Sequence, residues 1–493
     1  MQSEPVTFRT TWDRPKSGND NTAMINQSDN VTLDRPVSST GIDLELVKKY
    51  NVPGPRYTSY PTAVHFHDDV DQESLLRDLT LSARAAFPLS LYFHLPFCAS
   101  ACWFCGCTRV ITRSLSAPDR YLDYLEKEIA LTLPHTGPDR NVVQMHFGGG
   151  TPSYFSPEQV ARLEAIIRDA FQPGADSENS VEIDPRRIGP EHIEAWRRLG
   201  CNRASLGVQD NNPRVQQAIN RIQPREVTEQ VVGWLREAGF RSINIDLIYG
   251  LPHQTVASFS DTLEEVLALA PDRLAVFNYA HVPWIKPAQK IFDRRGGLPD
   301  SSTKLAILEK VAQRLADEGY VYIGMDHFAR AGDDLSRAQA EGTLQRNFQG
   351  YSTSAGTEIL GFGMSSISQT PNTYRQNIKE LHDYYDALDE GRLPWTRGRV
   401  LSREDRIRRE VISRLMCDLK LDFDIQSQSL GIDFESHFHT EIRALKPMER
   451  DGLIQWEDRG FAVTPAGRFL IRNIAMVFDA YLERSPTRYS RTV

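Results

Sequence analysis

The chain has 493 residues, of which 40% are hydrophobic and 25% charged, a composition typical of a globular protein with a sizeable core. This length suggests about three domain-sized units, or one large α/β domain with appendages. The formal net charge of −8 argues against broad electrostatic binding to nucleic acid, and no apolar run is long enough for a membrane span. Because the N-terminal region shows no secretory or transit-peptide pattern, we expect a cytoplasmic protein.

The first part of the chain changes character at about residue 43. Residues 1–42 are polar, with scattered proline, asparagine, serine and glycine, and we predict a disordered extension. Residues 43–87 form a predicted arm, in which several prolines exclude a long helix before Phe66. The arm carries Arg56, Tyr57 and Tyr60, and two interpretations stay open. The tyrosines pack the arm across the main domain, or the segment binds substrate.

The main domain is predicted at residues 88–371, where an apolar strand, a turn and an amphipathic helix alternate. We predict strands at Ser90–His94, Val142–Phe147, Ser180–Ile183, Arg203–Val208, Ser242–Ile248 and Arg273–Tyr279. Gly200, Gly239 and Gly319 follow helical segments, where a left-handed residue ends the helix. Alternating elements predict a parallel sheet with right-handed crossovers, whose chemistry lies on loops at the carboxyl ends of the strands.

Residues 372–493 are predicted to form a mainly helical C-terminal domain without strong strand runs. Candidate helices are Arg403–Leu419, Phe434–Glu449 and Gly467–Leu482, with a short hairpin over Gly452–Thr464. Helices with such a hairpin are similar to a winged-helix module, which in other proteins binds DNA. Because the chain is acidic and Phe434–Glu449 has no basic stripe, we favour a lid or packing role.

The strongest chemical signal is a loop with four of the six cysteines, Cys98, Cys102, Cys105 and Cys107. Thiolates this close together can converge on a metal ion or an iron–sulfur cluster. A zinc site would more often show two separated Cys-x-x-Cys pairs, and a disulfide knot would need a secreted chain. We therefore favour a cluster over zinc or unreactive thiols, and we expect Cys201 and Cys417 to be ordinary buried residues.

Glycines and polar residues follow the later strands. Gly148, Gly149 and Gly150 come directly after the second strand, where their backbone can approach a ligand closely. Further along, polar residues lie at or just after successive strand ends: Glu182, Gln209, Arg221 and Asp246. Carboxylates suit ribose hydroxyls and an arginine suits a carboxylate, but each residue could equally be a helix cap or a satisfied buried group.

The cysteine spacing Cys-x-x-x-Cys-x-x-Cys resembles the signature of radical S-adenosylmethionine (SAM) enzymes. Longer strings are similar to the family of oxygen-independent coproporphyrinogen III oxidases: Gly54–Tyr60, Tyr92–Cys98, Cys105–Cys107, Phe277–His281, Gly324–Ala329 and Arg346–Tyr351. The similarity runs from about Leu44 to Tyr481. It implies an α/β fold, a partial (β/α)6 TIM-like barrel of the radical SAM type with an N-terminal arm and a mainly helical C-terminal domain.

The resemblance also implies cofactors and their residues. Cys98, Cys102 and Cys105 would ligate a [4Fe–4S] cluster and, with Tyr92 close to the cluster, would be the catalytic residues; Cys107 would lie beside the cluster without binding iron. Two SAM molecules are implied. The first would contact Gly149, Gly150, Glu182, Gln209, Arg221, Asp246, Ala280 and Ile367, and the second would lie near Ile248 and Gln349. Tyr92, Cys107 and Thr151 complete the predicted cofactor-binding set.

The implied reaction is the oxidative decarboxylation of two propionates of coproporphyrinogen III to vinyl groups, which gives protoporphyrinogen IX in haem biosynthesis. An electron from the reduced cluster would split SAM into methionine and a 5′-deoxyadenosyl radical, which takes a hydrogen from the propionate β-carbon. The four substrate carboxylates need cationic partners, for which Arg56, His327 and Arg346 are candidates. A monomer is expected, with a small electron donor such as flavodoxin or ferredoxin and no nucleic-acid partner.

One alternative has a different class of function. A haem chaperone of the same superfamily keeps the cluster motif but binds and delivers haem, because a shared fold does not determine function. In that relative the motif generally lacks the additional cysteine, so Cys107, the Arg56–Tyr57 segment and the Met325–Phe328 string favour the oxidase.

Overall fold

The computed structural model describes residues 44–69, 71–137, 140–482 and 489–490. The predicted disordered extension, residues 1–42, lies outside the described residues. Among the described helices, none combines the length and the apolar character that crossing a membrane requires.

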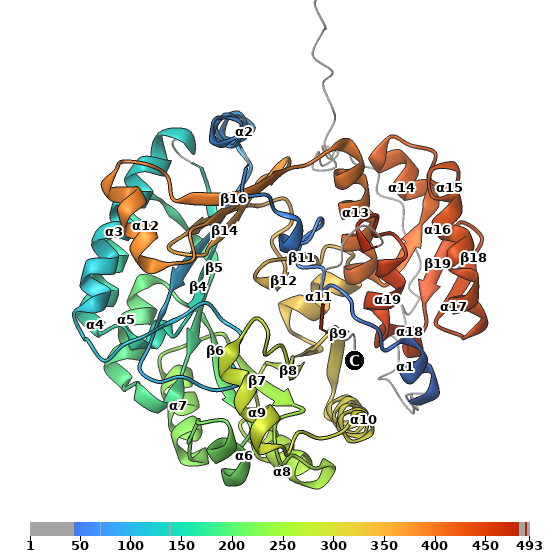
Figure 1. Cartoon of the computed structure of the whole chain (residues 1–493), viewed down its shortest axis with the longest axis horizontal. Coiled ribbons are helices and arrows are strands. Elements are labelled where there is room, and N and C mark those ends of the chain that lie inside the picture. The colour runs from blue at the N-terminus through green and yellow to red at the C-terminus, as the bar shows by residue number, and fades with distance from the viewer. Residues whose placement is uncertain (1–43, 70, 138–139, 483–488, 491–493) are drawn as a thin grey trace, which may run out of the picture.

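Six parallel strands form the centre of a 12-stranded sheet, in the order β1-β4-β5-β6-β7-β8 (Figure 1). They are β1 (Leu89–Leu95), β4 (Val142–Gly149), β5 (Pro173–Ile183), β6 (Arg203–Gln209), β7 (Ser242–Tyr249) and β8 (Arg273–Asn278). All six predicted strands are confirmed, and their carboxyl ends meet at one edge of the sheet, where a parallel barrel places its chemistry.

Crossover helices connect these strands and cover the outer face of the sheet. They are α3 (Ala117–Thr132), α4 (Pro157–Ala170), α5 (Pro190–Leu199), α6 (Pro213–Ala218), α7 (Arg225–Glu237) and α8 (Val256–Leu267). In α4 a capping box formed by Ser156 and Gln159 fixes the start, and Val160, Leu163 and Ile167 are buried at helical spacing. Gly200 ends α5 with a φ of 113°, as its position after the helix predicts.

Antiparallel additions extend the sheet on both sides of the parallel centre, and only β13 beside β1 is parallel among them in the described part of the chain. The added strands are β9 (Tyr320–Gly324), β10 (His327–Arg330), β13 (Glu358–Phe362), β14 (Ile367–Gln369), β15 (Thr373–Asn377) and β16 (Trp395–Val400). Smaller elements in this region are β11 (Gln345–Asn347), β12 (Gly350–Ser352), α9 (Lys290–Arg295), α10 (Ser301–Asp317), α11 (Asp334–Ala340) and α12 (Leu381–Asp389).

The expectation that the chain beyond residue 372 lacks strand runs is wrong, because β15 and β16 pair with each other at the edge of the large sheet. All five residues of β15 are buried although its sequence, Thr-Tyr-Arg-Gln-Asn, is polar. The guanidinium of Arg375 is buried against the ring of Trp395, 5.1 Å from its centroid, so a charged residue occupies an interior position. A hydrophobic pattern could not reveal such a strand. The division into domains at residues 42, 87 and 371 stays a prediction.

The N-terminal arm contains α1 (Leu44–Tyr50), a coil segment and α2 (Gln72–Arg84), so no long helix precedes Phe66, as the prolines predict. Tyr57 and Tyr60 are buried in the core of the C-terminal module, and Leu75 and Leu79 of α2 pack into the core of the barrel. The packing interpretation of the arm therefore holds for its tyrosines.

The C-terminal module begins with α13 (Arg403–Asp418), which confirms the first predicted helix there. The remaining elements are β17 (Lys420–Asp422), α14 (Phe423–Leu430), α15 (Phe434–His437), α16 (His439–Ala444), α17 (Lys446–Arg450), β18 (Ile454–Glu457), β19 (Gly460–Val463), α18 (Pro465–Arg468) and α19 (Ile471–Met476). Short 3-10 helices elsewhere are η1 (Ala63–His65), η2 (Leu133–His135), η3 (Pro152–Tyr154), η4 (Pro185–Arg187) and η5 (Pro287–Gln289).

Strands β18 and β19 confirm the predicted hairpin, and β17 adds a third strand beside β19. The single helix predicted at Phe434–Glu449 is wrong, because the segment forms the three short helices α15, α16 and α17. Pro447, which has no backbone N–H to donate, lies in the first turn of the last one. The predicted helix over Gly467–Leu482 is shorter as well, since α18 and α19 end at Met476.

Candidate active site

The loop that carries the four cysteines begins at the carboxyl end of β1 and is held from several sides. Its first cysteine belongs to β2 (Phe97–Cys98), which pairs in parallel with β3 (Val110–Ile111). The guanidinium of Arg109 donates hydrogen bonds to the backbone oxygens of Cys102, Cys105 and Cys107, at 3.3, 3.4 and 3.5 Å respectively. The guanidinium of Arg109 therefore binds three carbonyl groups and stabilises the conformation of the loop.

The four cysteines of the loop differ in burial. Cys98 and Cys102 are buried, Cys105 is half-buried and Cys107 is exposed. Cys201 and Cys417 are fully buried elsewhere, as expected for ordinary core residues. Three thiols on one short loop form the soft donor set that an iron–sulfur cluster requires, so these residues fit the predicted cluster.

Two arginines face the sulfur of Cys102. The guanidinium groups of Arg221 and Arg186 lie 3.7 and 3.8 Å from its Sγ, and both also contact the carboxylate of Asp184, at 3.1 and 2.6 Å. Burial alone would raise the pKa of Asp184, but the hydrogen bonds and charges of the two arginines lower this pKa to about 2. The Sγ of Cys98 lies 3.1 Å from the hydroxyl of Thr151. The cysteine sulfurs thus face charged and polar donors.

The turn after β4 is packed so closely that only glycine fits. A Cβ on Gly150 would lie 2.2 Å from the backbone oxygen of Pro96, and one on Gly149 would lie 2.7 Å from the imidazole of His94. The backbone N–H of Gly149, whose φ is 116°, donates to a carboxylate oxygen of Glu182 at 3.1 Å. This turn leaves backbone groups accessible beside a carboxylate, which fits the polar methionine and ribose parts of SAM.

A cavity of about 300 Å³ opens between the glycine turn and strand β14. The predicted cofactor residues on its wall are Tyr92, Cys107, Gly149, Glu182, Gln349 and Ile367. These six residues come from six separate segments of the chain, and the fold brings them together. The Nε2 of Gln349 is buried without a hydrogen-bond partner among the described residues, and it is available to a ligand.

Two histidines of this cavity were not predicted as site residues. The hydroxyl of Tyr92 lies 3.1 Å from Nδ1 of His94, and its ring stacks on His146 with centroids 5.8 Å apart. His146 also contacts Glu182, at 3.4 Å. Burial lowers the pKa of His94 to about 4, so its imidazole is neutral near pH 7. His94 lies in the string Tyr92–Cys98, and His146 lies in the predicted strand Val142–Phe147. Their positions beside predicted site residues were the sequence feature that could have identified them.

The other predicted cofactor residues lie around the cysteine loop and the ends of β6 and β7. Gln209 has a φ of 71°, and its Oε1 is buried without a partner among the described residues. Asp246 accepts hydrogen bonds from Ser205 and Asn244, and burial together with the charge of Glu182 raises its pKa to about 7. Ile248 packs with the aromatic rings of the cysteine loop.

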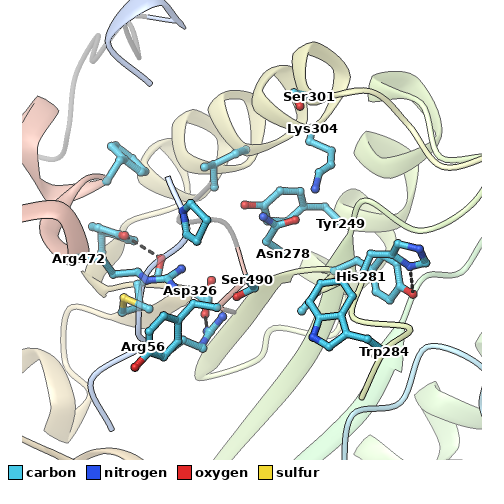
Figure 2. Close-up of a pocket in the computed structure, with 18 residues that line it drawn as sticks. Arg56, Tyr249, Asn278, His281, Trp284, Ser301, Lys304, Asp326, Arg472 and Ser490 are labelled. Atoms are coloured by element: carbon cyan, nitrogen blue, oxygen red, sulfur yellow. Dashed lines mark hydrogen bonds and ion pairs between the residues drawn. The ribbon is translucent and has the colours of Figure 1, made fainter. Parts of the chain in front are cut away.

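A larger cavity, of about 510 Å³, lies where the arm, the barrel and the C-terminal module meet (Figure 2). It includes Arg56 from the arm and Ala280 from the loop after β8, so one predicted substrate residue and one predicted cofactor residue share its wall. Arg56 forms an ion pair with Asp326. This cavity combines cationic groups with an apolar lining, which suits an organic anion.

The three predicted substrate residues come together, although only Arg56 is on this wall. The guanidinium of Arg346 donates to the backbone oxygen of Arg56 at 3.2 Å and lies over the ring of Tyr351, which also contacts His327. Burial and then the charges of Arg346 and Arg56 lower the pKa of His327 to about 3. His327 is therefore a neutral hydrogen-bonding group near pH 7, whereas the two arginines carry charge.

Sequence reasoning missed Tyr249, Lys304 and Arg472, which line the larger cavity. Arg472 offered a signal, because it interrupts the apolar run from Leu470 to Ile474 and is buried there. A buried arginine inside an amphipathic helix is rarely a surface group. Lys304 and Tyr249 gave no local signal, since a lysine on a helix and a tyrosine ending a strand are common.

The fold and the cysteine loop define a protein of the radical SAM type. The sequence model described as "Radical SAM superfamily" matches residues 92–266, and the model described as "HemN C-terminal domain" matches residues 401–470. The first match covers the cysteine loop, the glycine turn and strands β4 to β7.

Comparison with curated relatives identifies the family within this class. The chain is 47% identical to the oxygen-independent coproporphyrinogen III oxidase of Synechocystis, over 91% of this chain and 97% of the relative. It is also 47% identical to that of Escherichia coli, over 92% and 98% of the two chains. A solved structure of coproporphyrinogen III oxidase from Escherichia coli, described as a radical SAM enzyme, superposes with a TM-score of 0.85 at 46% identity, covering 89% of this chain and 99% of that one. The chain belongs to the oxygen-independent coproporphyrinogen III oxidase family.

Proposed function

We propose that this chain catalyses the oxygen-independent oxidative decarboxylation of two propionates of coproporphyrinogen III, giving the two vinyl groups of protoporphyrinogen IX. One observation carries the proposal: the cysteine loop and the glycine turn share a cavity of about 300 Å³, and six of the residues that the family resemblance implies for the cofactors lie on its wall. Identity of 44–47% to relatives that bear this name, over nearly their full length, supports it.

Cys98, Cys102 and Cys105 would hold a [4Fe–4S] cluster in this function. When bound, the cluster and SAM supply a 5′-deoxyadenosyl radical, which takes a hydrogen atom from the propionate β-carbon before CO₂ and one further electron leave. The chain positions these groups: Arg109 shapes the cysteine loop, and the glycine turn presents its backbone beside Glu182. Trp103 and Phe104 of the cysteine loop pack against an apolar cluster of the barrel, which fixes the position of the loop.

The number of SAM molecules is proposed as two, with the first at Gly149, Gly150, Glu182, Gln209, Arg221, Asp246, Ala280 and Ile367, and the second near Ile248 and Gln349. These contacts do not fit on the wall of one cavity. Glu182, Gln349 and Ile367 line the smaller cavity, Ala280 lines the larger one, and Ile248 packs on the side of Trp103 and Phe104.

We further propose that Arg56, His327 and Arg346 contact the substrate, the arginines through charge and the neutral His327 through hydrogen bonds. Two guanidinium groups that share a buried environment favour an anionic ligand, because a carboxylate between them offsets their mutual repulsion. A small electron donor such as flavodoxin or ferredoxin, a monomeric state and a cytoplasmic location complete the proposal.

The test is an anaerobic turnover of the protein with reconstituted cluster, SAM, a reductant and coproporphyrinogen III. Protoporphyrinogen IX and 5′-deoxyadenosine should appear together. Cys98→Ala should abolish SAM cleavage, whereas Cys201→Ala, a change at a buried cysteine outside the site, should leave turnover in place. SAM cleavage without vinyl products would contradict the substrate, and normal cleavage by Cys98→Ala would contradict the cluster assignment.

A further inference from the structure

The larger cavity is built from four parts of the chain that are distant in sequence. The arm contributes Arg56, the strand ends Tyr249 and Asn278, helix α10 contributes Lys304, and α19 of the C-terminal module contributes Arg472. Figure 2 shows these side chains around one space, with Arg56 and Arg472 on one side and Lys304 on another. The C-terminal module therefore completes a binding cavity of the barrel.

The hydroxyl of Tyr249 is accessible from this cavity. Tyr249 is only 4% exposed, and its hydroxyl makes no hydrogen bond with any residue that the structure describes. In Figure 2 its ring lies below Lys304, with the hydroxyl directed toward the side of Arg56 and Arg472. The Oδ1 of the neighbouring Asn278 is also buried without a partner among the described residues. The phenol of Tyr249 can therefore donate a hydrogen bond to a ligand in the cavity.

The charges around the hydroxyl select an anion. Burial and then the charges of Arg472 and Arg346 lower the pKa of Arg56 to about 9, and the single carboxylate of Asp326 pairs with Arg56 among these cations. Arg472 also donates hydrogen bonds to the backbone oxygens of Gly54 and Pro55, which holds the segment carrying Arg56 against the cavity. A carboxylate placed among these groups would offset the repulsion and accept hydrogen bonds from the guanidinium, ammonium and phenol.

The cavity adjoins the cysteine loop. Ala280 and Trp284 line it, and the same segment reaches the loop, where Lys286 donates to the backbone oxygen of Cys107 at 3.2 Å. Gln289 donates to the backbone oxygen of Phe104 at 3.0 Å. A molecule anchored in the cavity can therefore extend toward the cysteines.

The proposed substrate has a matching requirement. It carries four propionates, of which two react and two remain in the product. Groups that bind the remaining carboxylates must hold the macrocycle through both decarboxylations, and they need to lie away from the reacting atoms.

We propose that this cavity binds the propionate carboxylates that do not react, and that Tyr249 and Lys304 recognise one of them. This inference rests on the proposed function and assigns specificity-determining residues to it. Because substrate and product share these two propionates, the same residues bind both.

The test uses the anaerobic holoenzyme without reductant and measures the affinity for coproporphyrin III and protoporphyrin IX, the stable oxidised forms, by fluorescence titration. Lys304→Met should weaken binding of both porphyrins about tenfold or more, and Tyr249→Phe about threefold to tenfold, since each loses a charge-assisted hydrogen bond. Lys304→Arg should restore part of the affinity. The affinity for SAM and the cluster absorbance should not change.

Lys310→Met is the matched control, because it removes a lysine from the exposed face of the same helix and should bind both porphyrins as the unmodified protein does. Unchanged porphyrin affinity in both Lys304→Met and Tyr249→Phe, in a protein that still makes vinyl products, would overturn this inference alone. An unmodified protein that yields no vinyl product would instead overturn the proposed function. Tyr249→Phe removes a single oxygen atom and keeps the ring, so we expect this variant to fold as the unmodified protein does.

Discussion

Gly150 lies where a single added methyl group has no room, and this makes it a direct test of the glycine turn at the scale of one residue. Its Cβ would be 2.2 Å from the backbone oxygen of Pro96, and a backbone cannot move as a flexible side chain can. We expect Gly150→Ala to lower the free energy of unfolding by about 1–3 kcal/mol, the range of an overpacked core, and to weaken SAM binding. Thermal unfolding and anaerobic SAM titration measure the two effects.

Gly106→Ala is the control for that variant, because Gly106 belongs to the cysteine loop and a Cβ there meets no atom within 4 Å. It should change the free energy of unfolding by less than about 0.5 kcal/mol. Equal stability of the two alanine variants would show that the glycine turn can shift, and the close-packing argument would fail.

Single residues could be predicted from the sequence where their chemistry is local. The cysteines and the glycines occupy consecutive positions, and their spacing alone restricts what they can bind. Tyr249, Lys304 and Arg472 could not be found in that way, because they meet only after β7, α10 and α19 have packed around one cavity. Their significance comes from the cavity that they share, which is not visible in a sequence.

At the scale of elements, the carboxylate of Glu128 joins helix α3 to three other segments. It accepts hydrogen bonds from the backbone N–H of Gly363, the amide of Asn377 and the hydroxyl of Tyr384, at 2.6–2.7 Å. Burial nevertheless raises its pKa to about 7, from 4.5. Folding therefore favours the protonated form, and this contribution to stability is full below about pH 4.5 and is lost as the pH rises through about 7.

We expect Glu128→Gln to remove this pH dependence. The melting temperature of the unmodified protein should fall relative to that of the variant as the pH rises from 4.5 to 7, because only the unmodified protein must then ionise a buried carboxyl group. Differential scanning calorimetry at several pH values measures the difference. A constant difference between the two proteins across that range would mean that Glu128 does not titrate there.

Elements with a regular apolar pattern were predictable, and those stabilised by polar contacts were not. The six parallel strands are apolar and alternate with amphipathic helices, so their order and their parallel direction followed from the sequence. Strand β15 escaped prediction because Arg375 and Asn377 are buried through stacking and hydrogen bonds. The break between α16 and α17 coincides with Pro447, whose effect the apolar periodicity of the segment does not reveal.

At the scale of the whole molecule, the arm connects the barrel to the C-terminal module. Tyr60 is buried among the residues of the module, its hydroxyl accepts a hydrogen bond from the backbone N–H of Ala480 at 3.0 Å, and its backbone oxygen accepts one from Tyr374 of β15 at 3.2 Å. The same arm carries Arg56 into the larger cavity. The sequence indicated an arm with tyrosines, but not that one segment of the arm serves both packing and the site.

This connection predicts which elements lose protection from hydrogen exchange when the packing of the arm is weakened. Tyr60→Ala removes a buried ring from the core of the module and should cost about 3–5 kcal/mol, the range for deleting a large aromatic side chain. Because the module and the arm share this core, hydrogen exchange should increase in α13 and in β18–β19, while β4 and β5 of the barrel remain protected. Tyr60→Phe, which keeps the ring, should cost only about 1 kcal/mol and leave the exchange pattern unchanged. If exchange in Tyr60→Ala increased equally in β4 and β18, the barrel and the module would unfold as one unit. The arm would then be a part of a single core, and the larger cavity could not open without unfolding the barrel.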